Sequence, residues 1–111
     1  MIVDDLRSKL FEYMKNKDAL RVDVLRFYLN QVKNKEIEFK SQNKEITDED
    51  AFKVLRKEIK NRKESIELYE KLGRTELLER EKAELGVYME FAELFPFELE
   101  NNNNPTFRGG K

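Results

Sequence analysis

The side chains best suited to bind a ligand are basic ones that crowd into one short segment. Between Lys53 and Lys63 the sequence has six lysines or arginines and one acid, Glu58. At about 3.6 residues per helical turn, most of these cations fall on one flank of a helix. The flank consists of Lys53, Arg56, Lys60 and Lys63, with Lys57 beside it. A basic stripe of this kind is typical of a surface that contacts nucleic-acid phosphates.

The acidic residues offer a second explanation for this stripe. The segment from Glu76 to Glu100 holds eight acids against Arg80 and Lys82. Two neighbouring helices could therefore pair their basic and acidic flanks, which also fits a formal net charge of −1. Exposed ion pairs contribute only ~0–1 kcal/mol each, so they would set helix register more than stability. Glu64 and Glu67 also interrupt the stripe, and the sequence leaves both explanations open.

Arg62 and Lys63 occupy an unusual level of the same segment. They lie between Ile59 and Ile66, where an apolar side chain would continue the stripe that faces the core. Long aliphatic stems can cross such a position while the charged heads reach water or pair with a glutamate. A structural role is therefore an alternative to ligand binding at both residues.

No residue pattern indicates catalysis. The sequence contains no Cys and no His, which excludes thiol nucleophiles, Ser-His-Asp catalysis and metal sites built on thiolate or imidazole. It also lacks a Gly-rich phosphate loop, because its only adjacent glycines are Gly109 and Gly110. A Ser-Lys arrangement is not excluded, but nothing around the serines indicates one. We expect no catalytic residue, no metal and no cofactor.

Length and composition predict one domain. The chain has 111 residues, of which 41% are charged and 39% hydrophobic, enough for a core. No run approaches the ~18 apolar residues of a membrane span, so we expect no membrane association. The amino-terminal residues lack a basic start before an apolar run, and Asp4 and Asp5 are acidic. These features predict a cytoplasmic protein and leave its oligomeric state open.

Four helices must position these side chains. Both prolines and three of the four glycines lie beyond residue 85, and helix-forming residues dominate what precedes them. Apolar residues recur there at three- and four-residue spacing. They predict helices from about Asp4 to Asn16, Ala19 to Phe39, Thr47 to Leu72 and Thr75 to Phe95. The predicted fold is an all-α bundle of four helices over residues 1–96, arranged as extended helical hairpins.

Local signals mark the ends of these helices. Thr47 can accept a hydrogen bond from the backbone N–H three residues on, and Asp50 reaches back less well than the glutamate of an ideal capping box. Gly73 suits the left-handed residue that ends a helix, and Pro96 disfavours helix at the residue before it. Gly86 inside the fourth helix costs about 1 kcal/mol relative to alanine, which fits either a close helix contact or no special role.

Apolar stripes predict which helix faces are buried. In the first helix, Phe11 and Met14 widen the stripe formed by Val3, Leu6, Leu10 and Tyr13. The second helix has apolar residues on two sides, which places its first half between neighbours. The predicted buried face of the fourth helix consists of Leu77, Leu78, Leu85, Tyr88, Met89, Ala92 and Phe95. Residues 97–111 show no periodicity and contain four consecutive asparagines, so we predict a disordered, flexible tail.

The sequence resembles the GatB/YqeY family. The strongest match is the segment Leu55 to Tyr69 (LRKEIKNRKESIELY) followed by Gly73 and Arg74. Weaker matches lie in residues 14–18, 25–26, 34–38, 47–50, 81–85 and 95–96. The resemblance covers about residues 4–99, in order and without large gaps. Typical members continue after this proline into a second, smaller helical domain, so a function carried by that domain is not expected of the residues here.

The resemblance implies a role in RNA binding. The family includes the tail of the B subunit of glutamine-dependent aspartyl/glutamyl-tRNA amidotransferase, which contacts tRNA while the carbon–nitrogen ligase chemistry lies elsewhere. It therefore implies a non-catalytic accessory module whose partner is tRNA or a tRNA-amidation complex. The candidate RNA-facing residues are Arg56, Lys57, Lys60, Arg62, Lys63 and Arg74.

An alternative function is a helical protein-interaction module without nucleic-acid binding. In that case the fourth helix should neutralise the basic flank, and apolar residues such as Phe27, Val87 or Leu94 should form an exposed patch. A third hypothesis, a catalytic fragment of a carbon–nitrogen ligase, lacks the residues for nucleotide and amide chemistry.

Overall fold

A computed structural model of the chain describes residues 1–99 and 106–107. Most of this part consists of four helices, α1 (Ile2–Lys15), α2 (Ala19–Lys40), α3 (Asp48–Leu72) and α4 (Thr75–Ala92). Two short strands follow, β1 (Phe97–Glu98) and β2 (Thr106–Phe107). The predicted all-α fold with four helices is confirmed, and the predicted helix bounds agree with the structure to within three residues.

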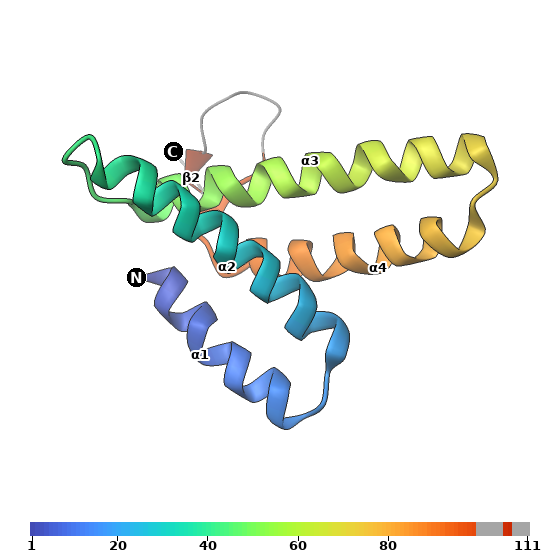
Figure 1. Cartoon of the computed structure of the whole chain (residues 1–111), viewed down its shortest axis with the longest axis horizontal. Coiled ribbons are helices and arrows are strands. Elements are labelled where there is room, and N and C mark those ends of the chain that lie inside the picture. The colour runs from blue at the N-terminus through green and yellow to red at the C-terminus, as the bar shows by residue number, and fades with distance from the viewer. Residues whose placement is uncertain (100–105, 108–111) are drawn as a thin grey trace.

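The helices form two antiparallel hairpins (Figure 1). α1 packs against α2, and α3 lies beside α4. The molecule has extents of 45 × 36 × 32 Å, and the α3–α4 hairpin follows its longest axis. α2 lies between α1 and the second hairpin, and the loop end of α3 and α4 projects beyond it. The predicted arrangement of extended helical hairpins is therefore confirmed. Among the described residues, no helix has both the length and the apolar character needed to cross a membrane.

The amino end of α3 is fixed by the predicted cap. The backbone N–H of Asp50 donates to Thr47 Oγ1 over 3.1 Å, and the N–H of Thr47 donates to Asp50 Oδ2 over 3.0 Å. Asp50 therefore completes the capping box despite its shorter side chain. The N–H of Ile2 donates to Asp48 Oδ1 over 3.1 Å, which joins the start of α1 to the same helix end.

A residue in the left-handed backbone conformation follows within three residues of the end of α1, α2 and α3. Lys17, Asn43 and Gly73 have φ angles of 57°, 58° and 67°. After Gly73, the N–H of Arg74 donates to the carbonyl of Tyr69, which with the bond from Gly73 to Glu70 makes a Schellman motif. The glycine signal predicted only the third of these ends, because lysine and asparagine carry no equally strong local signal.

α4 ends earlier than the sequence predicts, at Ala92 instead of Phe95. The backbone N–H groups of Glu93, Leu94 and Phe95 bond carbonyls three residues back, at 3.0 to 3.2 Å. The chain thus tightens into turns with 3₁₀-type bonds before Pro96, which disfavours helical geometry at the residue before it.

The predicted tail contains regular structure. Phe97 faces Phe107 and Glu98 faces Thr106 in an antiparallel pair of strands. Phe97 is buried, with its ring centroid 5.4 Å from that of Phe52 in α3. The prediction that residues 97–111 lack regular structure is therefore wrong for residues 97–98 and 106–107, because apolar packing on α3 orders the chain after Pro96. Residues 100–105 and 108–111 lie outside the described part.

The core lies where the two hairpins overlap. Tyr28 of α2 is fully buried at its centre, where its hydroxyl donates to the carbonyl of Ala51 over 2.7 Å. Burial raises the pKa of this phenol, so it remains a donor. The buried apolar residues are Val3, Leu6, Val24, Leu25, Tyr28, Val32, Ala51, Phe52, Leu55, Ile59, Val87, Tyr88, Phe91, Ala92, Phe95 and Phe97.

Several predicted core positions are exposed instead. Phe11 and Met14 of α1 are 74% and 46% exposed, because α1 packs mainly against α2 and contacts α3 at fewer positions. In α4, Leu77 and Met89 are exposed, whereas Val87 and Phe91 are buried. The predicted face of α4 was wrong at these positions, because α2 crosses only its second half.

Candidate nucleic-acid interface

The basic flank of α3 faces outward where the two helical hairpins overlap, a part of the molecule that we call the body. Lys53, Lys57, Lys60 and Lys63 are all exposed. Within the described residues, none of these four lysines takes part in an ion pair. Their ammonium groups are therefore available to an anionic ligand. We call these four residues the lysine row.

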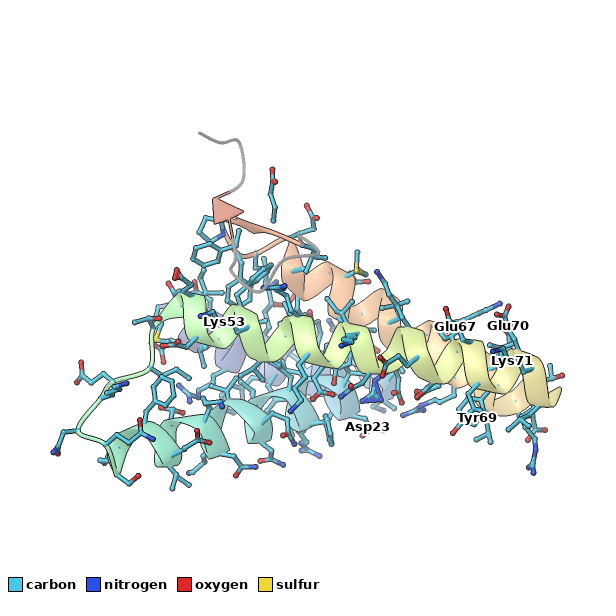
Figure 2. All side chains as sticks on the ribbon, turned by 90° about the horizontal axis from the view of Figure 1, so that it is seen from above. Asp23, Lys53, Glu67, Tyr69, Glu70 and Lys71 are labelled. Atoms are coloured by element: carbon cyan, nitrogen blue, oxygen red, sulfur yellow. The ribbon has the colours of Figure 1, made fainter. Side chains whose placement is uncertain are left out.

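The lysine row gives way to mixed charge toward the tip of α3. Figure 2 shows Lys53 at one end of the helix and Glu67, Glu70 and Lys71 at the other. The row runs from Lys53 to Lys63, which is roughly 15 Å of helix. Positive charge is therefore concentrated on the half of α3 that packs on the body.

The structure does not bring all six predicted RNA-facing residues together. Lys57, Lys60 and Lys63 lie in the lysine row. Arg56 is half-buried beside it and is not free. Arg74 is exposed but lies at the loop between α3 and α4, roughly 16 Å further along the helix axis from Lys63. Arg62 points away from this surface into the helix junction.

Arg62 forms an ion-pair network inside the molecule. Its guanidinium lies 2.9 Å from Glu58, 3.6 Å from Glu81 and 3.4 Å from Glu84. The side chain of Arg62 is only 16% exposed, and that of Glu58 only 7%. Arg62 thus pairs α3 with the acids of α4, as the alternative explanation for the stripe requires.

The network also includes aromatic rings and shifts two pKa values. The Arg62 guanidinium lies 5.8 Å from the ring centroid of Phe27 and 5.7 Å from that of Tyr88. Burial opposes the charge of Arg62, but Tyr88 and the neighbouring carboxylates outweigh it and raise its pKa. Burial also raises the pKa of Glu81, although Arg62 pulls in the other direction. A guanidinium held this way serves the fold, not a free ligand.

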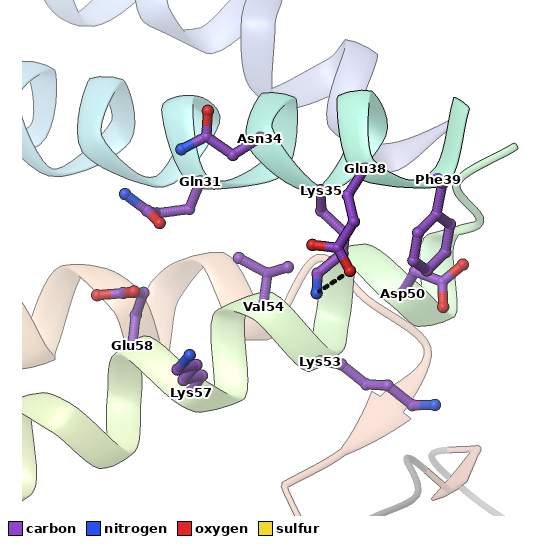
Figure 3. A pocket seen from close by; sticks show the side chains of 10 residues that line it. All are labelled: Gln31, Asn34, Lys35, Glu38, Phe39, Asp50, Lys53, Val54, Lys57 and Glu58. Carbon is purple, nitrogen blue, oxygen red and sulfur yellow. Dashed lines mark ion pairs between the residues drawn. The ribbon is translucent and has the colours of Figure 1, made fainter. Parts of the chain in front are cut away.

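A groove between α2 and α3 extends the lysine row. It has a volume of about 460 Å³, and its walls carry Lys53 and Lys57 from α3 (Figure 3). Gln31, Asn34 and Lys35 line it from α2. The carboxylates around it already have partners, since Glu38 pairs with Lys35, Asp50 caps α3 and Glu58 pairs with Arg62. The groove therefore offers ammonium and amide donors to an anion.

The sequence did not reveal the α2 wall of this groove. Gln31, Asn34 and Lys35 are common polar residues with no recognisable motif, and only the crossing of α2 over α3 places them beside the lysines.

Of the apolar residues suggested as an alternative binding patch, Phe27 and Leu94 are 44% and 40% exposed, whereas Val87 is buried. In the described residues, no group of carboxylates is arranged to hold a metal ion.

A family model described as "Yqey-like protein" matches residues 3–103. The chain belongs to the YqeY family. The resemblance inferred from Leu55 to Tyr69 is thus confirmed over nearly the whole chain. The lysine row and the groove lie on α2 and α3 of this YqeY domain.

Two relatives match most of this chain. An uncharacterised protein of Schizosaccharomyces pombe is 33% identical over 86 residues, which is 78% of this chain and 68% of that protein. A protein of Lachancea thermotolerans called "Altered inheritance of mitochondria protein 41, mitochondrial" is 34% identical over 98 residues, which is 88% of this chain. The present chain covers only 51% of that second relative.

Proposed function

We propose that this YqeY-family chain is an accessory module that binds tRNA through the lysine row and the adjoining groove. One observation carries the proposal: four exposed lysines share one face of α3, and no carboxylate of the described part neutralises them. Phosphate contacts by lysine release counterions and supply most of the sequence-independent affinity for nucleic acid. The proposed role is binding, with any amide-transfer chemistry left to a partner in a tRNA-amidation complex.

The groove adds shape to this charge. Lysines on α3 can contact successive phosphates along one strand, while Gln31 and Asn34 can bond a sugar or a base edge. Arg62 is omitted from the proposed contacts because it is committed to Glu58, Glu81 and Glu84. Arg74 is omitted because of its separation from the row.

The proposal is tested by titrating fluorescent tRNA with the chain at about 50 mM and about 200 mM salt. The test variant changes Lys53, Lys57 and Lys60 to Gln. The control variant changes three other exposed lysines, Lys15, Lys17 and Lys82, to Gln, so both carry the same net charge.

We expect wild type and control to bind tRNA, and to bind it more weakly at the higher salt. The test variant should bind more weakly, and the slope of its log–log salt dependence should be smaller by about 2 to 3. Absence of binding by folded wild-type chain at the lower salt contradicts the proposal. Equal losses in both variants would show that net charge matters and position does not.

The predicted protein-interaction function is the alternative that this titration separates from RNA binding. The partial exposure of Phe27 and Leu94 favours this protein-interaction function. Against it, α4 neutralises Arg62 but leaves the lysine row without carboxylate partners in the described part. The cytoplasmic location also stays a prediction. The name of the Lachancea relative assigns that protein to mitochondria. Fractionation of the source cells can test the location of the present chain.

A further inference from the structure

A second surface combines exposed apolar side chains with basic ones. It lies on the hairpin of α1 and α2, on the side away from the outer face of α3 (Figures 1 and 2). Phe11 is the most exposed large apolar side chain of the described part, at 74%, and Ile37 and Met14 are 60% and 46% exposed. Exposed apolar side chains that form a contiguous patch mark interaction surfaces, whereas single ones are common on any protein surface.

These apolar residues follow the seam between the two helices. Arg7, Phe11 and Met14 share one face of α1, because they are separated by four and three residues. Arg7 Nη2 reaches Glu36 of α2 over 3.3 Å, and Met14 Sδ accepts from Arg26 of α2 over 3.7 Å. Phe11 lies between Arg7 and Met14 on this face of α1, and its side chain is exposed to solvent.

The seam opens into a hollow at the end of the hairpin. The hollow has a volume of about 570 Å³. Its lining includes Arg7, Lys33, Glu36, Ile37, Lys40 and Lys44. They come from the start of α1, the last turns of α2 and the connection to α3. Ile37 therefore presents its side chain inside a concave surface.

Charge around the hollow is predominantly basic. Arg7 is already engaged by Asp4 and Glu36, at 2.9 Å and 3.3 Å. In contrast, the exposed side chains of Lys33, Lys40 and Lys44 form no ion pair within residues 1–99 and 106–107. These three lysines flank the apolar seam and can receive carboxylates from a ligand.

We propose that the α1–α2 seam binds an acidic amphipathic helix of a partner protein. A helix whose apolar residues recur every three or four positions can cover Phe11 and Ile37, in the manner of helix-in-groove recognition. Glutamates on its flanks would meet Lys33, Lys40 and Lys44. This charge complementarity, together with a concave site, selects a helix over a flat lipid surface, and Met14 and Ile37 offer nothing to a nucleic-acid backbone.

The test uses a designed helical peptide with a stripe of leucines and glutamate elsewhere, and a scrambled peptide of the same composition. Binding is followed by fluorescence anisotropy and by amide chemical shifts of the chain. The test variant is Phe11→Asp with Ile37→Asp. Its matched control is Leu68→Asp with Leu72→Asp, which changes two exposed apolar residues near the loop end of α3. Circular dichroism verifies that both variants fold.

We expect the striped peptide to bind wild type and the Leu68/Leu72 control, with shifts along Arg7–Met14 and Arg26–Lys44. The Phe11/Ile37 variant should bind at least about tenfold more weakly, because it loses two central anchors. Equal binding of the scrambled peptide, or no binding of the striped peptide, overturns the proposal. Binding of vesicles rich in anionic phospholipid at this seam without peptide binding would identify a membrane surface instead.

The seam and the lysine row are tested independently. The Phe11→Asp, Ile37→Asp variant should keep its affinity for tRNA, and the Lys53, Lys57, Lys60→Gln variant should keep its affinity for the peptide. Failure of tRNA binding would thus leave the seam intact as a docking site.

Discussion

Arg62 shows how one residue can resemble a binding residue and serve the fold. Its position in a basic segment predicted RNA contact, whereas its level between Ile59 and Ile66 left open a structural role with the charged head in water or paired with a glutamate. The structure shows the second role, with three carboxylates around one guanidinium. A partly buried network of this type costs desolvation energy and contributes most by preventing the carboxylates from being left unpaired.

We therefore expect Arg62→Leu to destabilise the chain by about 2 kcal/mol, less than the loss for a fully buried pair because Arg62 retains some exposure. The reason is the charge left on Glu58 and Glu81 without a cation, whereas Glu84 keeps its pair with Arg80 over 2.7 Å. Urea denaturation measures the change. Adding Glu81→Gln to Arg62→Leu should recover part of the loss, and an unchanged midpoint for Arg62→Leu would contradict the network's role.

Acidification should reduce the same loss. The folded-state pKa of Glu81 is raised above its ordinary value of 4.5, chiefly by burial. Its ionisation therefore costs stability as the pH rises from 4.5 through the folded-state pKa. Without Arg62 this cost grows, so the difference between Arg62→Leu and wild type should be larger at neutral pH than below pH 4.5. Melting midpoints across this range measure it.

At the scale of the element, helix ends and helix interiors make opposite demands on glycine. Gly73 ends α3 with a φ of 67°, whereas Gly86 lies inside α4. A Cβ added to either would meet no atom within 4 Å. Only backbone conformation then distinguishes the two substitutions, and the possible close helix contact at Gly86 is absent.

Gly73→Ala should destabilise the chain by about 1 kcal/mol, because alanine is strained in the left-handed region. Gly86→Ala should stabilise it by about 0.5 to 1 kcal/mol, because alanine loses less backbone entropy in a helix. Thermal melts of the two variants provide each other's control. Changes of the same sign would show that backbone conformation is not the deciding factor.

The segment after Pro96 should contribute to stability. Phe97→Ala should destabilise the chain by about 3 kcal/mol, because it removes a buried ring that packs on Phe52. Leu99→Ala, at a 38% exposed position nearby, should change the free energy of unfolding by less than about 0.5 kcal/mol. Denaturant unfolding compares the two. Equal small effects would indicate that this segment does not pack on the core in solution.

Helix bounds could be predicted because their signals are local, whereas buried faces were predicted only in part. Thr47 and Gly73 specify an N-cap and a left-handed end through their own backbone chemistry. In α4, by contrast, Leu77 and Phe91 are equally apolar, and the crossing of α2 decides that only Phe91 is buried. The same limit applies to the site: the lysines were predicted from sequence, but the α2 wall of the groove and the acidic partners of Arg62 depend on tertiary contacts.

The whole molecule consists of a body and an arm. In the body, where both hairpins overlap, Phe52, Leu55 and Phe91 are buried. In the arm, the loop end of the α3–α4 hairpin extends beyond α2, and Leu68, Leu72 and Leu77 are 52%, 58% and 45% exposed. Both proposed surfaces lie on or close to the body, so their geometry does not depend on the arm remaining rigid.

This division predicts uneven protection from hydrogen exchange. Few buried apolar contacts hold the arm, so it should open locally with a free energy well below that of global unfolding. Amides of residues 66–80 should therefore exchange at least about 100-fold faster than those of residues 52–59, measured by NMR or mass spectrometry. Gly73→Ala should accelerate exchange in the arm further and leave the body close to wild type. Equal protection along α3 would contradict this division and show that the two hairpins unfold as a single cooperative unit.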